Sequence, residues 1–357
     1  MDKKKFAQKI IEWYHEHKRF LPWRETRDPY KIWLSEIILQ QTRVAQGFPY
    51  YLKFVECFPN VFTLAGTREQ DVLRLWQGLG YYTRARNLHR CAKLIVQEYA
   101  GRFPNNFTAL KKLPGIGPYT AAAIASVAFL EPVAVVDGNV FRVLARVFGI
   151  EKDIATSDGK DYFFFVANSL IPKDHPDEFN QAMMEFGATL CLPRNPKCDD
   201  CIFKRQCIAF ARDEQAHFPV KRKKLKNRNR YFYYFVLRRG NAFLMRKREG
   251  KDIWRGLYDF YSVETKRPQK TERIIEACRT LGKMGQKIEA GKPSSIYEHI
   301  LSHQTLHVRF IPLKIPPEQS IRPVSLPPKL KFYTRREIHK LPKPVLISQY
   351  LSDIGFL

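Results

Sequence analysis

Four cysteines lie within a short stretch of this chain, at Cys191, Cys198, Cys201 and Cys207. The gaps between them hold six, two and five residues. A tetrahedral zinc site normally takes two close pairs of ligands separated by a longer excursion, whereas three short gaps wind all four thiolates around one compact object. The spacing therefore favours a [4Fe-4S] cluster as the cofactor. A zinc knuckle and a disulfide cluster are the alternatives.

The remaining cysteines, Cys57, Cys91 and Cys278, are scattered through apolar stretches with no pairing logic. Thiolate ligands occur where cysteine stays reduced, and the N-terminal residues lack the composition of a signal or transit peptide. We therefore expect an intracellular protein, and the lack of targeting features favours a bacterial cytoplasm.

Two carboxylates have surroundings that suit opposite roles. Glu36 lies in the largely apolar stretch 33–42, where burial would raise its pKa, as a general acid near neutral pH requires. Asp137 follows the apolar run 133–136 and precedes a helical pattern, whose dipole would keep it ionised and able to stabilise or attack a sugar cation. The alternatives are an exposed glutamate on a polar helix stripe and a simple N-cap aspartate.

A tight turn in Leu-Pro-Gly-Ile-Gly-Pro precedes the Ala-rich helical run 121–129. Its glycines, Gly115 and Gly117, have no Cβ atoms, so a phosphate can approach the backbone N–H groups at the start of the helix. The pattern is typical of a helix-hairpin-helix that grips a DNA backbone without reading sequence. An ordinary helix start is the alternative.

Helical periodicity dominates the part of the chain that must position these side chains. Short Pro/Gly/Asn breaks at 58–60 and 103–106 are the connections expected of a compact bundle. We predict a helical domain over residues 1–217. Apolar residues recur at three- and four-residue spacings over 6–14, 31–39, 69–76, 86–99 and 179–190.

The composition changes at the basic run 221–230, and we predict a linker over 218–230, either solvated or lying along phosphates. Beyond it, we predict a smaller α+β domain over 231–357. Its expected elements are a hairpin of strands at 231–237 and 242–245, a helix near 271–282, a strand at 304–313 and a helix near 344–352.

The charge of the chain points to a polyanionic partner. The 357 residues carry 61 Lys and Arg against 35 Asp and Glu, a formal net charge of +26. Nucleic acid is the first candidate for such a surplus. No apolar run approaches the roughly 18 residues that span a bilayer, which makes a membrane partner the weaker hypothesis.

These motifs together resemble one family over nearly the whole chain. The cysteine cluster, the Leu-Pro-Gly-x-Gly turn followed by Val-Asp-Gly-Asn-Val, and Ser-Glu-Ile-Ile-Leu-Gln-Gln-Thr are similar to the helix-hairpin-helix DNA glycosylases, and most to the MutY family of adenine DNA glycosylases. The resemblance implies double-stranded DNA as partner, removal of adenine opposite 8-oxoguanine or guanine, and a monomer. A related mismatch or oxidised-base glycosylase, or a DNA-binding homologue without catalysis, is the alternative.

The resemblance also implies roles for residues of the reaction centre. Glu36 would protonate adenine N7, Asp137 would stabilise or briefly bond the oxocarbenium carbon, and Asn139 would help to position that chemistry. Tyr119 stands where the related lyases carry a Schiff-base lysine, so we expect a monofunctional enzyme.

Base flipping accounts for further residues by the same resemblance. Gln41 and Tyr81 would fill or wedge the vacated helix, and Gln41 also borders the expected adenine pocket. Trp23, Arg24 and Tyr119 would line that pocket.

The C-terminal part resembles the Nudix-like recognition domain of the same family. Residues 254–260 match its Trp-x-Gly-Leu-aromatic segment, and the acidic helix needed for pyrophosphate hydrolysis is missing. Ser302 and His303 lie where the family carries a Phe-Ser-His loop that senses 8-oxoguanine, but the first position here is Leu301, which removes a stacking option.

Overall fold

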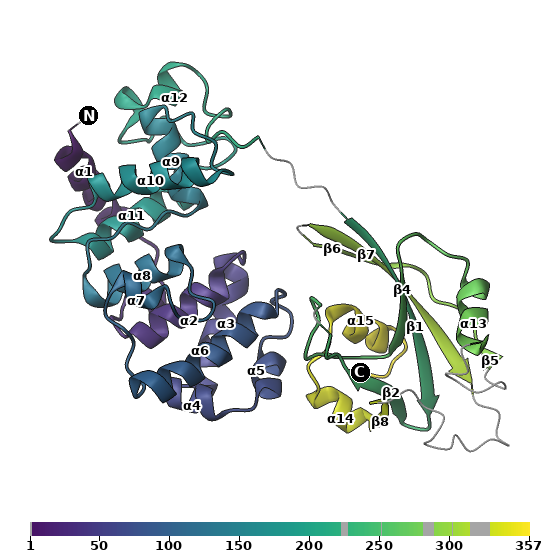
Figure 1. Ribbon diagram of the computed structural model, residues 1–357. Coiled ribbons are helices and arrows are strands. Elements are labelled where there is room, and N and C mark those ends of the chain that lie inside the picture. Colours follow the sequence, from purple (N-terminus) through teal and green to yellow (C-terminus); the bar gives the residue numbers. More distant parts are fainter. Residues whose placement is uncertain (1, 223–227, 251, 281–288, 302, 315–328) are drawn as a thin grey trace. The chain divides into compact units, whose positions relative to one another are not determined.

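The computed structural model describes residues 2–222, 228–250, 252–280, 289–301, 303–314 and 329–357 (Figure 1). Contacts divide the chain into two compact units. The first comprises Met1–Gly66 and Asn87–Lys224, and the second comprises Thr67–Arg86 and Leu225–Leu357. No helix among these described residues is long and apolar enough to cross a bilayer.

The first unit is helical, which confirms the predicted fold class of this part (Figure 1). Helix α6 crosses the boundary between the units. The elements are α1 (Lys3–His17), η1 (Pro22–Arg24), α2 (Pro29–Leu39), α3 (Val44–Cys57), α4 (Val61–Gly66), α6 (Thr83–Tyr99), α7 (Phe107–Leu110), α8 (Pro118–Phe129), α9 (Gly138–Phe148), α10 (Ser157–Leu170), α11 (Pro176–Thr189), η2 (Lys204–Gln206) and α12 (Ile208–Ala211).

Local sequence explains where the two central helices of this unit begin. Pro118 occupies the first turn of α8, where its missing N–H costs no hydrogen bond, and the small residues that follow let the helix pack close to its neighbours. Asp137 caps α9, whose apolar residues lie on one face. An aromatic contact joins α1 to the cysteine loop, residues 191–207. Phe6 of α1 stacks on Phe203 of this loop with ring centroids 4.7 Å apart.

The second unit contains a mixed sheet with strand order β3-β2-β1-β7-β5, in which β4 pairs with β1, β6 with β7 and β8 with β2. The helix α5 (Glu69–Leu75) belongs to this unit as well. Its other elements are β1 (Arg228–Arg239), β2 (Ala242–Lys247), β3 (Tyr258–Asp259), β4 (Tyr261–Thr265), α13 (Thr271–Thr280), β5 (Glu289–Ala290), β6 (Tyr297–Ile300), β7 (Gln304–Lys314), β8 (Lys331–Thr334), α14 (Arg335–Lys340) and α15 (Val345–Asp353).

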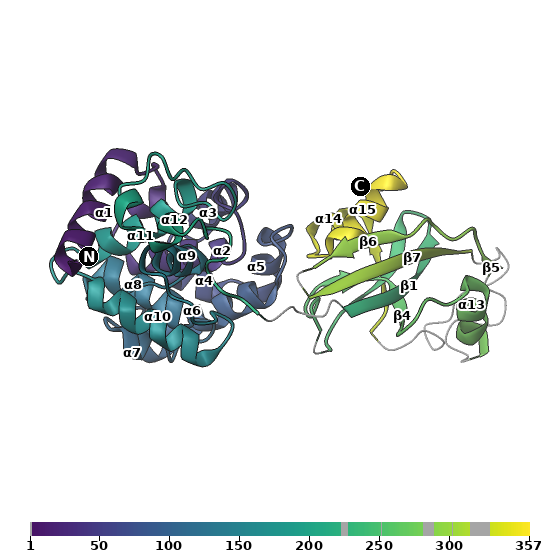
Figure 2. The same cartoon turned by 90° about the horizontal axis from the view of Figure 1, so that it is seen from above.

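Helices cover both faces of this sheet (Figures 1 and 2). Alternate residues of a strand point to opposite faces. Tyr233 and Phe235 pack with Ile274 of α13, whereas Phe310 of β7 stacks on Tyr350 of α15 with centroids 4.0 Å apart. The strands therefore carry near-continuous apolar runs, which explains the unbroken aromatic stretch in β1.

Two boundaries differ from the sequence prediction. Strand β1 begins at Arg228, inside the expected linker 218–230, because the Arg230 guanidinium pairs with Asp252 and with Glu264 of the adjacent strand β4. Residues 223–227 of that linker lie outside the described part of the chain. Residues 67–86 belong to the second unit, where Gln77 Nε2 donates to Ser348 Oγ at 3.0 Å.

The predicted hairpin is present. Strands β1 and β2 pair antiparallel, with Arg238 opposite Phe243, and Gly240 in the turn has φ +57°, in the left-handed region that glycine adopts without strain.

Candidate active site

A small cavity of about 220 Å³ in the helical unit brings the two predicted carboxylates together. It is smaller than the roughly 300 to 1,000 Å³ of pockets that take drug-sized ligands, as suits a single planar base. Six elements supply its walls: η1, α2, the start of α3, α8, the start of α9 and α11.

Helix periodicity explains how these walls are built. Side chains spaced three and four residues apart lie on one face of a helix. Each of three helices turns one such stripe toward the cavity. The stripes are Ile32, Ser35, Glu36 and Leu39 of α2; Tyr119, Ala123 and Val127 of α8; and Gln181, Met184, Glu185 and Ala188 of α11.

Glu36 has the environment that the sequence predicted. Burial raises the pKa of its carboxyl to about 7, and the nearby charge of Asp137 also acts upward. A hydrogen bond with the Tyr119 hydroxyl and the charge of Arg24 act in the opposite direction. A carboxyl with such a pKa is partly protonated at neutral pH and can donate a proton there.

Asp137 is held by its own helix. One of its carboxylate oxygens accepts hydrogen bonds from the backbone N–H groups of Asn139 and Val140, both at 2.8 Å, and the other accepts from the Asn139 side chain at 2.8 Å. The N-cap role and a place in the cavity therefore hold together. Burial raises the pKa of Asp137 above its ordinary value, although these hydrogen bonds and the charge of Arg142 act to lower it. The helix end therefore does not hold the pKa of this carboxyl low, as the sequence predicted.

Arg142 connects this carboxylate to the cysteine loop. Its guanidinium donates to Asn139 Oδ1 at 2.9 Å, to the Gly187 carbonyl at 2.6 Å and to the Cys191 carbonyl at 2.7 Å. Asn139, which holds Asp137, is thus itself held by a buried arginine. Arg142 therefore links the loop that carries Cys191 to the position of Asp137.

The four clustered cysteines interact with one another. Burial raises the pKa of the Cys201 thiol to about 12, and the other three thiols, at Cys191, Cys207 and Cys198, add to that rise. Among the described residues, no three His, Cys, Asp or Glu side chains form a group that could hold a metal ion. Four thiols are the ligand set that a [4Fe-4S] cluster takes.

Hydrogen-bond donors also face these sulfurs. Arg146 donates to Cys191 Sγ at 3.4 Å, and the Phe203 N–H donates to Cys201 Sγ at 3.4 Å. Such donors stabilise metal-bound thiolates. The residues present therefore fit the predicted group.

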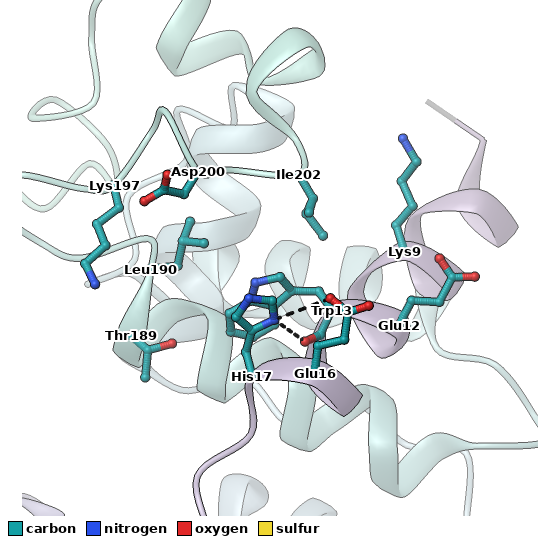
Figure 3. A pocket seen from close by; sticks show the side chains of 10 residues that line it. All are labelled: Lys9, Glu12, Trp13, Glu16, His17, Thr189, Leu190, Lys197, Asp200 and Ile202. Atoms are coloured by element: carbon teal, nitrogen blue, oxygen red, sulfur yellow. Dashed lines mark hydrogen bonds and ion pairs between the residues drawn. The ribbon is translucent and has the colours of Figure 1, made fainter.

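A wider pocket of about 630 Å³ lies beside the same loop, between α1 and residues 189–202 (Figure 3). His17 stacks on Trp13 there, and its Nδ1 donates a hydrogen bond to the Trp13 carbonyl, 2.9 Å away. Its carboxylates, Glu12, Glu16 and Asp200, are exposed. Because none of them is buried, this pocket lacks the acid-base environment of the cavity around Glu36.

The predicted pocket residues Trp23, Arg24 and Tyr119 line the cavity with the two carboxylates and with Asn139, but Gln41 does not. Gln41 is exposed in the turn after α2, with φ +54°.

The remaining predicted contacts lie at exposed turns. Tyr81, in the second unit, is 38% exposed with φ +46°. Gly115 has φ +78°, and it precedes α8 together with Gly117, which confirms the tight turn before a helix. In the hairpin between β6 and β7, the Leu301 N–H donates to the Gln304 carbonyl at 2.8 Å, and His303 is exposed. Ser302 lies outside the described residues, and so does the side chain of Cys278.

Sequence reasoning missed the contribution of α11, above all Gln181 and Glu185. The signal was available, because both are polar residues one helical turn apart within the mostly apolar stretch 179–190. Glu185 is fully buried, and Gln181 accepts a hydrogen bond from the Tyr14 hydroxyl at 2.6 Å.

Comparison with known proteins shows which family the chain resembles. Residues 34–161 match the family model of the HhH-GPD superfamily base excision DNA repair proteins, and residues 233–353 match that of the NUDIX domain. The adenine DNA glycosylase of Buchnera aphidicola subsp. Schizaphis graminum is 35% identical over 304 residues, which cover 85% of this chain and 86% of the relative. The chain belongs to the adenine DNA glycosylase family.

Other members of the adenine DNA glycosylase family and its neighbours fit the same assignment. The human adenine DNA glycosylase is 41% identical over 219 residues, 59% of this chain and 40% of the human one. A thermostable thymine-DNA glycosylase matches with TM-score 0.54 and 31% identity over 59% of this chain and 97% of its own.

An endonuclease III bound to DNA has the same fold, with TM-score 0.52 at 20% identity, over 60% of this chain and 98% of its own. As a member of the adenine DNA glycosylase family, this chain is a glycosylase of base excision repair, a hydrolase of N-glycosyl bonds.

Proposed function

We propose that the cavity around Glu36 and Asp137 hydrolyses the N-glycosidic bond of adenine mispaired with 8-oxoguanine or guanine in duplex DNA. The observation that carries this proposal is the placement of both carboxylates in one cavity of base size, with the pKa of Glu36 raised to about 7. Two carboxyl groups with different surroundings can divide the roles of acid and electrostatic partner.

In the proposed reaction Glu36 gives its proton to adenine N7, which makes the base a neutral leaving group when the bond to C1′ breaks. The electron pair of that bond goes to the base, and Asp137 stabilises the positive charge left on the sugar. Water then adds its oxygen to C1′ and leaves its proton on a carboxylate. The products are free adenine and an abasic site.

The cavity supports hydrolysis without strand cleavage. Tyr119 stands at the position where a Schiff-base lysine would be needed, and among the described residues no lysine lines the cavity. With no amine to attack C1′, the proposed enzyme is monofunctional.

DNA must deliver the adenine to this site by flipping it out of the stack. We assign Trp23, Arg24 and Tyr119 to the walls that receive the base, and Gln41 and Tyr81, both exposed, to the vacated duplex. The turn at Gly115 and Gly117 offers backbone N–H groups to a phosphate. Such contacts position the enzyme, as a monomer, on double-stranded DNA without reading its sequence.

The second unit is assigned to the opposite base. Its Trp254 and Leu257 are buried, so the Trp-x-Gly-Leu segment belongs to the core of this unit. Leu301, Ser302 and His303 at the hairpin after β6 are then the proposed contacts to 8-oxoguanine. Because Leu301 offers no ring for stacking, we expect the enzyme to distinguish 8-oxoguanine from guanine less strongly than it would with an aromatic residue at this position.

A [4Fe-4S] cluster is the proposed cofactor, held by Cys191, Cys198, Cys201 and Cys207. When bound it would order the loop that carries these ligands. The loop is basic, with Arg194, Lys197 and Lys204, and an ordered basic loop can contact phosphates.

The test is a single-turnover assay on duplexes that carry adenine opposite 8-oxoguanine, guanine or thymine, with a guanine-thymine mismatch included because a thymine-DNA glycosylase shares the fold. We expect adenine release that is fastest opposite 8-oxoguanine and an intact strand until alkali is added. Thymine release from the mismatch, or nicking by the enzyme alone, would contradict the proposal.

The rate of adenine release should also depend on pH in a defined direction. Glu36 must be protonated to act, so the rate falls as the pH rises through about 7, the pKa of its carboxyl. Single-turnover rates between pH 5 and 9 check this. A rate that rises through neutral pH would contradict the role of Glu36 as acid.

A further inference from the structure

Glu185 is one of the α11 residues that line the cavity, and its fully buried carboxylate binds two guanidinium groups. Arg19 donates to it from Nε and, at 2.8 Å, from a terminal nitrogen, and Arg24 donates to it at 2.7 Å. The Arg24 side chain is only 11% exposed, so its ion pair with Glu185 is shielded from water. Buried ion pairs are stable only when each charge keeps its partners.

The charges balance in the folded protein. Burial by itself would raise the pKa of Glu185, but hydrogen bonds and charge from Arg19 and Arg24 outweigh it and hold the pKa below its ordinary value. The carboxylate is therefore ionised at neutral pH, where it offsets part of the positive charge of the two arginines.

Arg24 is fixed from three sides. Besides Glu185, the Arg19 carbonyl accepts a hydrogen bond from Arg24 at 3.2 Å, and the Arg24 guanidinium lies over the ring of Tyr14, 5.6 Å from its centroid. Its remaining side faces the cavity, which it lines together with Glu36.

Among the described residues, the charged or titratable groups that act on the Glu36 carboxyl are Tyr119 of α8, Asp137 before α9 and Arg24 of η1. Arg24 is the positive charge among them and favours the ionised form of Glu36. A carboxylate that pairs with Arg24 therefore limits how far Arg24 can oppose protonation of the acid.

We propose that Glu185 is a positioning residue of the glycosylase reaction. It holds Arg24 in the cavity wall and neutralises its charge, and so keeps Glu36 protonated at the pH of the reaction. This inference rests on the proposed function, because it assumes that Glu36 acts as the acid.

A matched pair of variants separates charge from packing. Glu185→Gln keeps the size of the side chain but removes its charge, whereas Glu185→Asp keeps the charge on a shorter side chain. In Glu185→Gln we expect the fall of the single-turnover rate with pH to move down by about one pH unit, a loss of about tenfold at pH 8. Glu185→Asp should restore most of the wild-type pH profile.

The effect must run through Arg24. Arg24→Gln should move the fall of the rate to higher pH, and Glu185→Gln should shift the profile less in that background than in wild type. A Glu185→Gln enzyme that is folded by circular dichroism and has the wild-type profile would overturn the inference. If that variant does not fold, an unchanged profile in Arg24→Gln would overturn it instead.

The proposed function can fail separately from this inference. If the wild type releases no adenine, or its rate does not depend on Glu36, the proposed function fails. If the wild type shows the fall near pH 7 and only the Glu185 and Arg24 variants leave it unmoved, the positioning role alone fails.

Discussion

Glu36 and Asp137 differ in what compensates their burial. Three hydrogen bonds from Asn139 and Val140 hold the Asp137 carboxylate, whereas Glu36 has the Tyr119 hydroxyl and the more distant charge of Arg24. A buried carboxyl with so few donors is costly to ionise. At the residue scale, the protein therefore keeps Glu36 available as an acid at a cost in folding stability.

That cost can be measured with Glu36→Gln. The folded-state pKa of about 7 lies above the ordinary 4.5, so the folded form binds the proton more tightly and stability falls as the pH rises from about 4.5 to 7. Because Gln does not titrate, the stability of the variant does not fall in this pH range for that reason. We expect its free energy of unfolding at pH 8 to exceed that of wild type by about 1 to 3 kcal/mol, while adenine release falls.

Urea unfolding at pH 4 and pH 8 checks this prediction. The two proteins should be nearly equally stable at pH 4, because Glu36 is then protonated in both states. Glu98→Gln, at an exposed position of α6, serves as the control. A Glu36→Gln variant that is less stable than wild type at pH 8 would contradict the buried, raised-pKa environment.

At the scale of elements, the contact between α9 and α11 sets the position of the carboxylate. A Cβ added at Gly187 of α11 would lie 2.5 Å from Asn139 Cβ and 3.0 Å from Asn139 Cα. The backbone of Asn139 cannot move aside without moving Asp137, which it holds. The absence of a side chain at Gly187 thus permits the geometry of the site.

Gly187→Ala should therefore destabilise the protein by about 1 to 3 kcal/mol and slow adenine release. In an open helix the same change would stabilise by up to about 1 kcal/mol, so the sign itself is informative. Gly66→Ala, at the end of α4 with nothing within 4 Å of the added atom, is the matched control. Equal effects of the two changes on stability and on rate would contradict this account.

Much of this element-scale arrangement is predictable from the sequence, because apolar periodicity marks α2 and α11 and the residues around Asp137 are typical of a capped helix. The pairing of Glu185 with Arg19 and Arg24 is not, because it joins residues about 160 positions apart and depends on how α11 packs. The assignment of residues 67–86 to the second unit likewise rests on long-range contacts such as that of Gln77 with Ser348. Periodicity reports which face of a helix is buried, not which neighbour buries it.

At the scale of the whole molecule, the net charge of +26 should govern DNA affinity. Each phosphate neutralised by Lys or Arg releases counterions, so log affinity should fall linearly with log salt. For six to ten phosphate contacts the loss is about 10³- to 10⁵-fold between 50 and 200 mM salt. Fluorescence anisotropy with undamaged and mismatched duplexes measures the slope, and affinity that does not change with salt would contradict a phosphate-based interface.

The central claim is that the cavity of Glu36 and Asp137 releases adenine, and Asp137→Asn tests it most directly. Asn keeps the size and can still cap α9, but it lacks the charge that stabilises the sugar cation. The measurement is free adenine released in a single turnover from a duplex with adenine opposite 8-oxoguanine. Asp161→Asn, exposed on α10 and outside the cavity lining, is measured alongside. We predict a loss of at least about 100-fold for Asp137→Asn and none for Asp161→Asn; an unchanged rate in Asp137→Asn would contradict the account.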